Sequence, residues 1–188
     1  MAIQTIYVYS PFANSGRITG LNTYCGSNIT HYPCNSGFSS PVDIAATGSI
    51  FLRATNIKSC ITRITYTCCT SYSGCGNDYR RTIIVDLYGR ENAVCYIGSV
   101  AFGHIVAATH IVHNQIYNFN NNPYTLPFLL GTATTGGCPD QPPRCSTGTH
   151  CHMEQKKGTR MSLTCQQTVT SGTAIYKFTW DDSKPCPI

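Results

Sequence analysis

Short runs of alternating or β-branched residues follow one another along almost the whole chain, separated by clusters of Gly, Asn, Ser and Pro. Successive side chains of a strand point to opposite faces, so such runs predict strands with one buried face. The runs lie at Thr5–Tyr9, Ser49–Ala54, Ile61–Thr67, Arg81–Leu87, Ala93–Val100, Ile105–Val112 and Thr173–Trp180. Helical periodicity is scarce. We therefore predict an all-β fold, mostly antiparallel, with long loops.

The chain has 188 residues, with no internal repeat and no shift in composition. This length is typical of one domain with its own core, so we predict that residues 1–188 form a single domain. Two segments rich in turn-forming residues, Asn118–Pro123 and Gly136–Pro143, are predicted loops. The second loop directly precedes a pair of histidines, and loops beside a pocket commonly determine specificity.

Cysteine is frequent, with 12 residues in the chain. An even number in a loop-rich chain indicates a disulfide framework and an oxidising compartment, so we expect a secreted, extracellular protein. A cysteine-ligated zinc or iron–sulfur site fits less well, because the sequence lacks paired C-x-x-C motifs at zinc-ribbon spacing. Residues 1–8 lack the charged and apolar regions of a signal peptide, so we expect a mature form or indirect export. No apolar run is long enough to predict a membrane span.

Charged residues are few and slightly basic in sum, with 13 Lys and Arg against 8 Asp and Glu and a net charge of +5. This charge favours an anionic partner such as a bacterial wall or a glycan. Basic residues cluster only at Arg80-Arg81 and Lys156-Lys157, and no nucleic-acid-binding motif is present. We therefore expect no nucleic-acid partner.

The pair His150 and His152 carries the main chemical signal of the sequence. On an extended strand these two side chains lie on the same face, about 6–7 Å apart, which suits a metal ligand beside a base. Cys151 between them is predicted to point to the other face, into a disulfide bond or the core.

Two upstream residues complete a candidate metal site. His31 and Asp43 flank a loop-like stretch, residues 35–41, and Asp43 lies in the strand-like run Val42–Ala46. If these two residues converge with one of the paired histidines, three protein ligands leave a fourth position open, as in catalytic zinc sites.

The sequence around these residues resembles the M23 family of zinc endopeptidases, the LytM, lysostaphin and β-lytic group, which cleave cross-bridges of bacterial peptidoglycan. Ser146-Thr147-Gly148-x-His150-x-His152 resembles the S-T-G-P-H-x-H signature of that family. Other segments resemble its remaining motifs in order: His31 with Pro41–Ala54, the strand Thr82–Asp86, Phe102–Ile105 at the place of Tyr-x-His-Leu, and the glycine-containing turn Gly131–Gly136. The resemblance covers roughly Ser27 to Gly158.

The resemblance implies that His31, Asp43 and His152 bind one zinc ion per chain. It also implies catalytic roles for His104 and His150, as a base and as a stabiliser of the oxyanion. The implied fold is a single antiparallel domain between a sandwich and a barrel, and the implied function is that of a secreted zinc metalloendopeptidase acting on peptidoglycan. The twelve-residue step from His31 to Asp43 exceeds the H-x-x-x-D spacing of the lysostaphin type and resembles the β-lytic or staphylolysin branch.

Alternative interpretations remain at each position. His104 also fits a half-buried strand residue, and Asp43 a turn-capping carboxylate. His110 and His113 form a rival pair, but alternation places them on opposite faces, so we interpret them as structural or surface residues. A non-catalytic extracellular binding or structural module of the same fold is the second functional hypothesis, and an unrelated disulfide-rich lectin or toxin is the third. Hydrolysis needs both His104 and His150 beside the metal, whereas binding needs only the ligands.

Overall fold

The computed structural model describes residues 2–66, 81–120, 123–134 and 148–186. Within these ranges it contains thirteen strands and no helix, so the predicted all-β class is confirmed. Likewise, none of the described segments is a helix long and apolar enough to cross a membrane. The predicted loop Gly136–Pro143 and the signature residues Ser146 and Thr147 lie outside the described residues.

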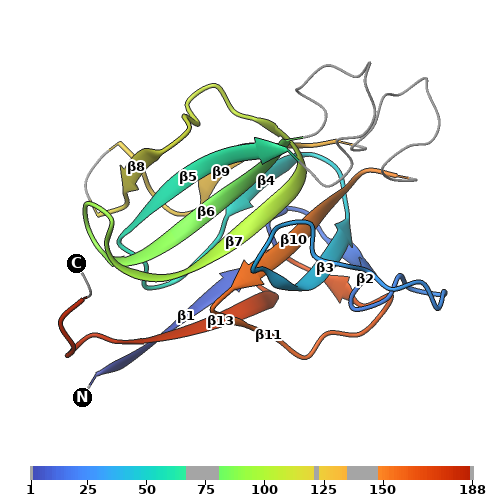
Figure 1. Cartoon of the computed structure of the whole chain (residues 1–188). Coiled ribbons are helices and arrows are strands. Elements are labelled where there is room, and N and C mark those ends of the chain that lie inside the picture. The colour runs from blue at the N-terminus through green and yellow to red at the C-terminus, as the bar shows by residue number, and fades with distance from the viewer. Residues whose placement is uncertain (1, 67–80, 121–122, 135–147, 187–188) are drawn as a thin grey trace.

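The strands form two sheets, and all pairings are antiparallel (Figure 1). The smaller sheet has the order β1-β13-β11, and the larger one the order β12-β2-β3-β10-β7-β6-β5-β8, with β9 pairing with both β7 and β4. Among the described strands neither sheet closes into a barrel. The smaller sheet contains β1 (Ile3–Tyr9), β11 (Thr159–Arg160) and β13 (Ala174–Asp181). The larger sheet contains β2 (Gly16–Gly20), β3 (Ser39–Ala45), β4 (Ser49–Leu52), β5 (Ser59–Tyr66), β6 (Arg81–Arg90), β7 (Val94–Ala107), β8 (Gln115–Asn118), β9 (Phe128–Ala133), β10 (His150–Lys156) and β12 (Thr168–Val169).

All seven predicted runs overlap strands, but the predicted break between Val100 and Ile105 is wrong. Strand β7 continues through this region because it pairs with β10 on one side and β6 on the other, and the chain turns only at residues 109–110. The short strands β2, β8 and β9 have no long alternating run and are absent from the prediction. Residues Gly131–Ala133 end β9 and do not form the turn that the resemblance implies.

The hydrophobic core includes side chains from both sheets, and strand β10 shows how its two faces are used. Cys151 and Met153 are fully buried in the core cluster together with Val8 and Phe178 of the smaller sheet. Because successive side chains alternate, His150 and His152 project from the opposite face of the larger sheet. This second face carries the candidate metal ligands and is called the histidine face below.

Two disulfide bonds lie within the described residues. Cys25 bonds to Cys165, and Cys95 bonds to Cys186. Cys34 is also disulfide-bonded. The predicted disulfide framework is therefore present, and such bonds are typical of proteins from oxidising compartments. Cys60 and Cys151 are nevertheless free and buried. Of the two predictions for Cys151, a disulfide bond or a place in the core, the core is therefore correct.

Candidate metal centre

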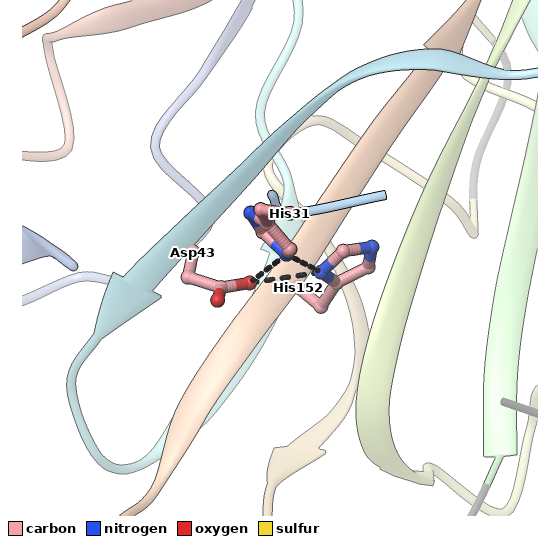
Figure 2. A group of neighbouring side chains, drawn as sticks. All are labelled: His31, Asp43 and His152. Carbon is pink, nitrogen blue, oxygen red and sulfur yellow. Dashed lines mark hydrogen bonds and ion pairs between the residues drawn. The ribbon is translucent and has the colours of Figure 1, made fainter. Parts of the chain in front are cut away.

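Three side chains from distant parts of the sequence converge on the histidine face (Figure 2). Asp43 on β3 and His152 on β10 are direct partners in the antiparallel register, so their side chains lie on the same face. His31 belongs to the segment between β2 and β3, and its backbone N–H donates to the Asn22 carbonyl at 2.9 Å. All three residues are buried, with 4–5% of their surface exposed.

The distances within the cluster suit one small metal ion. The Nε2 atom of His31 lies 3.0 Å from Nδ1 of His152 and 3.3 Å from Oδ1 of Asp43. The same Nδ1 atom of His152 lies 2.8 Å from Oδ1 of Asp43. In a tetrahedral zinc site with bonds of about 2.0–2.1 Å, ligand atoms lie about 3.3 Å apart. The three atoms therefore need to move apart by only a few tenths of an ångström to bind zinc.

The hydrogen bonds on the far side of each ring show which nitrogen carries a lone pair. The Nδ1–H of His31 donates to the Leu21 carbonyl at 2.8 Å, since that oxygen only accepts. The Nε2–H of His152 donates to the Glu154 carboxylate at 2.7 Å for the same reason. In the neutral rings, His31 Nε2 and His152 Nδ1 therefore both present lone pairs to Asp43. Three electron-rich atoms at such short distances require a positive charge among them, from a proton or a metal ion.

Electrostatics within the cluster also favour a positive charge. Burial alone raises the pKa of the Asp43 carboxyl, but hydrogen bonds from His152 and His31 outweigh burial and hold the pKa well below its ordinary value. Burial alone lowers the pKa of His152, but the hydrogen bonds to Asp43 and Glu154 raise it to about 9. The carboxylates thus stabilise whatever cation the cluster holds.

Glu154 supports the ligands from the same strand. It is fully buried, and its carboxylate accepts hydrogen bonds from the backbone N–H of Cys34, from the backbone N–H of Asn35 at 3.0 Å and from the Asn35 amide at 3.1 Å. Burial raises the pKa of Glu154, but the bond from His152 and these donors lower it below its ordinary value. Glu154 therefore stays ionised and holds the His152 ring in one orientation, as carboxylates beside metal-binding histidines commonly do.

A second grouping, Cys34, His152 and Glu154, also has the ligand types and spacing of a metal site. Cys34 is disulfide-bonded, so it has no thiolate to offer. Moreover, Glu154 already accepts three hydrogen bonds from Cys34 and Asn35. The grouping of His31, Asp43 and His152 is therefore the better candidate.

His150 lies at the edge of this cluster, as its position two residues before His152 predicts. Its Nδ1–H donates to the Gly148 carbonyl at 3.0 Å, so the neutral ring has its lone pair at Nε2. That Nε2 atom lies 3.7 Å from Oδ1 of Asp43, and 14% of the side chain is exposed. A base in this position faces the ligands while keeping access to solvent.

His104 is brought to the same place by an irregularity in β7. In the pairing of β6 with β7, Thr82 opposes Gly103 and Arg81 opposes Ile105, so His104 is the extra residue of a β-bulge. Its φ of 59° is in the left-handed region, which non-glycine residues rarely adopt. The bulge turns its ring to within 4.5 Å of the His150 ring, measured between centroids.

The His104 ring is buried and neutral. Burial, together with the neighbouring His150 and His152, lowers its pKa to about 3. Its Nδ1 atom is buried and has no hydrogen-bond partner among the described residues. A buried ring nitrogen without a partner is uncommon, and one explanation is that it acts on a ligand. His104 is thus a strand residue, as the alternative interpretation has it, but it is buried and its Nδ1 is unsatisfied among the described residues.

Gly20 is a functional position that the sequence did not reveal. It pairs with Asp43 across β2 and β3, and a Cβ atom at this position would lie 2.8 Å from Oδ2 of Asp43 and 2.9 Å from Nδ1 of His31. Any side chain here would push two ligands out of place. Only the tertiary pairing of β2 with β3 shows this requirement. Glu154, in contrast, continues the i, i+2 pattern of His150 and His152, so its place on the same face of the strand could have been predicted from the sequence.

The rival pair His110 and His113 lies outside the site, as predicted. His110 is exposed, bonds to the Leu129 carbonyl at 2.9 Å and packs against Phe128. His113 is also exposed, and its Nδ1 accepts from the Ile64 N–H at 3.1 Å.

We expect a Glu154→Gln variant to bind zinc about 10–100-fold more weakly than the wild type, because the amide keeps the shape of the side chain but loses the charge that orients His152. A competition titration against a chelating dye measures this affinity. A Glu91→Gln variant makes the same change in the turn between β6 and β7 and is expected to keep wild-type affinity. Equal affinities for the two variants would show that Glu154 does not support the ligand.

Comparison of the chain with family models, with curated proteins and with solved structures gave no match.

Proposed function

We propose that this protein is a secreted zinc metalloendopeptidase that hydrolyses peptide bonds in the cross-bridges of bacterial peptidoglycan. The observation that carries the proposal is the presence of two further histidines, His104 and His150, beside a cluster of three metal ligands. The ligand set of two imidazoles and one carboxylate is one that catalytic zinc sites use. The substrate class rests on the motifs that resemble those of the M23 peptidases and on the mildly basic composition.

The atoms that face the site determine which residues would bind zinc and which would orient the ligands. His31, Asp43 and His152 would hold zinc through Nε2, Oδ1 and Nδ1, the three atoms that converge. A bound zinc ion supplies a Lewis acid that polarises the scissile carbonyl and increases the acidity of the attacking water. Glu154 and the Leu21 carbonyl fix the two imidazole rings through their outer nitrogens.

Proton transfer is assigned to His150. Its Nε2 accepts a proton from the attacking water, while the bond from Nδ1–H to the Gly148 carbonyl holds the ring. As the new carbon–oxygen bond forms and the carbon–nitrogen bond breaks, His150 returns this proton to the leaving amine. Its partial exposure leaves room for a substrate to reach Nε2.

Stabilisation of the oxyanion is assigned to His104. A neutral imidazole carries one N–H, and this group donates to the carbonyl oxygen as negative charge develops on it. The bulge in β7 presets the ring, so little reorganisation is needed during the reaction. A module that only binds zinc needs neither histidine, so the pairing of His104 with His150 favours the enzyme over the non-catalytic alternative.

The test is to incubate the zinc-loaded protein with purified peptidoglycan and with oligoglycine peptides, and to count newly formed amines by mass spectrometry. We expect release that stops when zinc is removed by a chelator and returns when zinc is added back. The masses of the fragments identify the cleaved bond. No release from a protein that holds one zinc ion would support the non-catalytic module. Failure to bind zinc at all would refute the metal centre itself.

A further inference from the structure

A second feature of the histidine face is a polar pocket beside the metal centre. The pocket has a volume of about 560 Å³ and is lined mainly by strands β2 and β3 and by the chain around β12. Its walls include Arg17, Thr19, Ala45, Gln166 and Thr168. We call it the Arg17 pocket.

The strand register connects this pocket to the candidate base. Ala45 of β3 pairs with Arg17 of β2 on one side and with His150 of β10 on the other. Residues opposite one another in antiparallel strands project to the same face, so the side chains of all three residues lie in one row. Adjacent strands are about 4.8 Å apart, so the backbone of Arg17 lies about 10 Å from that of His150.

The pocket has a positive charge. Arg17 is the one ionisable side chain among the residues that line it, the others being serine, threonine, glycine, alanine and glutamine. One guanidinium nitrogen of Arg17, Nη1, donates to the Gln166 side chain at 3.2 Å. A guanidinium has five N–H donors in a planar fork, so one such bond leaves others to face a ligand. Among the described residues no carboxylate forms an ion pair with Arg17.

The residues that orient Arg17 are held in place by a disulfide bond and by strand pairing. Gln166 follows Cys165, which is disulfide-bonded to Cys25, and its backbone N–H donates to the Ile18 carbonyl at 2.9 Å. Thr168 of β12 pairs directly with Arg17. The guanidinium is therefore presented from paired strands beside a covalent cross-link, which is the arrangement expected of a preorganised binding site.

We propose that the Arg17 pocket is a carboxylate-binding subsite of the proposed peptidase, and this inference rests on that proposed function. An extended peptide advances about 3.3 Å per residue, so a substrate bound with its scissile bond at His150 reaches Arg17 with its second or third residue from that bond. The guanidinium accepts a carboxylate at this position through paired N–H···O bonds. The preferred substrate is thus a peptide with an acidic side chain or a terminal carboxylate two or three residues from the cleaved bond.

Binding can be measured apart from cleavage by fluorescence anisotropy with the zinc-loaded His150→Ala protein. Three labelled glycine-rich peptides distinguish the sources of the carboxylate: one has a free C-terminal carboxylate, one a C-terminal amide, and one a C-terminal amide with glutamate near the end. We expect at least one acidic peptide to bind about tenfold more tightly than the neutral amide peptide, as suits a hydrogen-bonded ion pair that is partly exposed. The acidic peptide that shows the preference identifies the source.

A pair of arginine variants makes the test specific. Adding Arg17→Gln is expected to make the acidic and neutral peptides bind equally, with the neutral peptide unaffected. Adding Arg90→Gln makes the same change at an exposed arginine at the end of β6 and is expected to keep the tenfold preference. Two results would overturn the subsite. One is equal binding of acidic and neutral peptides to the His150→Ala protein that retains Arg17, and the other is a preference for the acidic peptide that survives Arg17→Gln.

The two proposals fail in different ways. If the wild-type protein cleaves none of the peptides but the Arg17-dependent preference persists, the peptidase is wrong and the carboxylate site stands. If the wild-type protein cleaves acidic and neutral peptides at equal kcat/KM and binding shows no preference, the peptidase stands and the subsite is wrong.

Discussion

A His150→Ala variant is expected to lose about 10²- to 10⁴-fold in kcat for peptide hydrolysis while still binding one zinc ion per chain, because the substitution removes the proposed general base and none of the three proposed metal ligands. The side chain is mostly buried at the edge of the cluster but keeps some exposure, and its Nδ1–H bonds to the nearby Gly148 carbonyl, so we expect the fold to tolerate the change. Single-turnover rates of amine release, together with elemental analysis of bound zinc, measure the two quantities separately.

The matched control for this experiment is His113→Ala, which removes an exposed histidine on the chain between β7 and β8. We expect this control to keep wild-type kcat and zinc content. If His150→Ala loses its zinc along with its activity, His150 is a ligand and not the base. If its kcat equals that of the control, the proton-transfer role belongs to another group.

An Asp43→Asn variant is expected to lose stoichiometric zinc and, with it, the thermal stabilisation that zinc gives the wild type. Asparagine keeps the size of aspartate but removes the negative charge that faces the two imidazole rings. At free zinc about 100-fold above Kd, the wild type should gain about 2.7 kcal/mol of stability. For a domain of this size, that gain corresponds to a rise of about 5–11 °C in Tm. Calorimetry with and without zinc measures both proteins.

Asp182→Asn serves as the control because Asp182 is an exposed carboxylate near the C-terminal end of β13, about 4.0 Å from Arg90. Its zinc-dependent rise in Tm is expected to equal that of the wild type, since exposed ion pairs contribute little. A full rise in Tm for Asp43→Asn would remove Asp43 from the ligand set. Its interpretation as a turn-capping residue is already wrong, because Asp43 lies inside β3 and pairs with both β2 and β10.

The fold class was predictable because the alternation of buried and more exposed side chains along strands such as β1 and β13 is already visible in the sequence. The continuity of β7 was not, because Gly103 and His104 interrupt the alternating pattern and are kept in the sheet by pairing on both sides. The bulge at His104 has no local sequence signal either. Its left-handed backbone is imposed by the register of β6 against β7.

The candidate ligands were predictable from motif order, which placed His31, Asp43 and His152 together before any distance was known. Their supporting contacts were not. The Leu21 carbonyl binds His31 through the backbone, so its residue type carries no signal. The need for glycine at position 20 arises from contacts with residues 31 and 43, and only the fold brings those positions together.

The Cys25–Cys165 bond closes a covalent ring of chain, and positions 31, 43, 104, 150 and 152 all lie inside it. A single proteolytic cut anywhere between the two cysteines opens the ring but leaves both fragments joined through sulfur. The five residues of the candidate site then remain part of one molecule, and a nicked protein would migrate as one band on a gel until it is reduced. For the proposed secreted peptidase, which would encounter other proteases and copies of itself, such a ring would keep both halves of the site together after one cleavage.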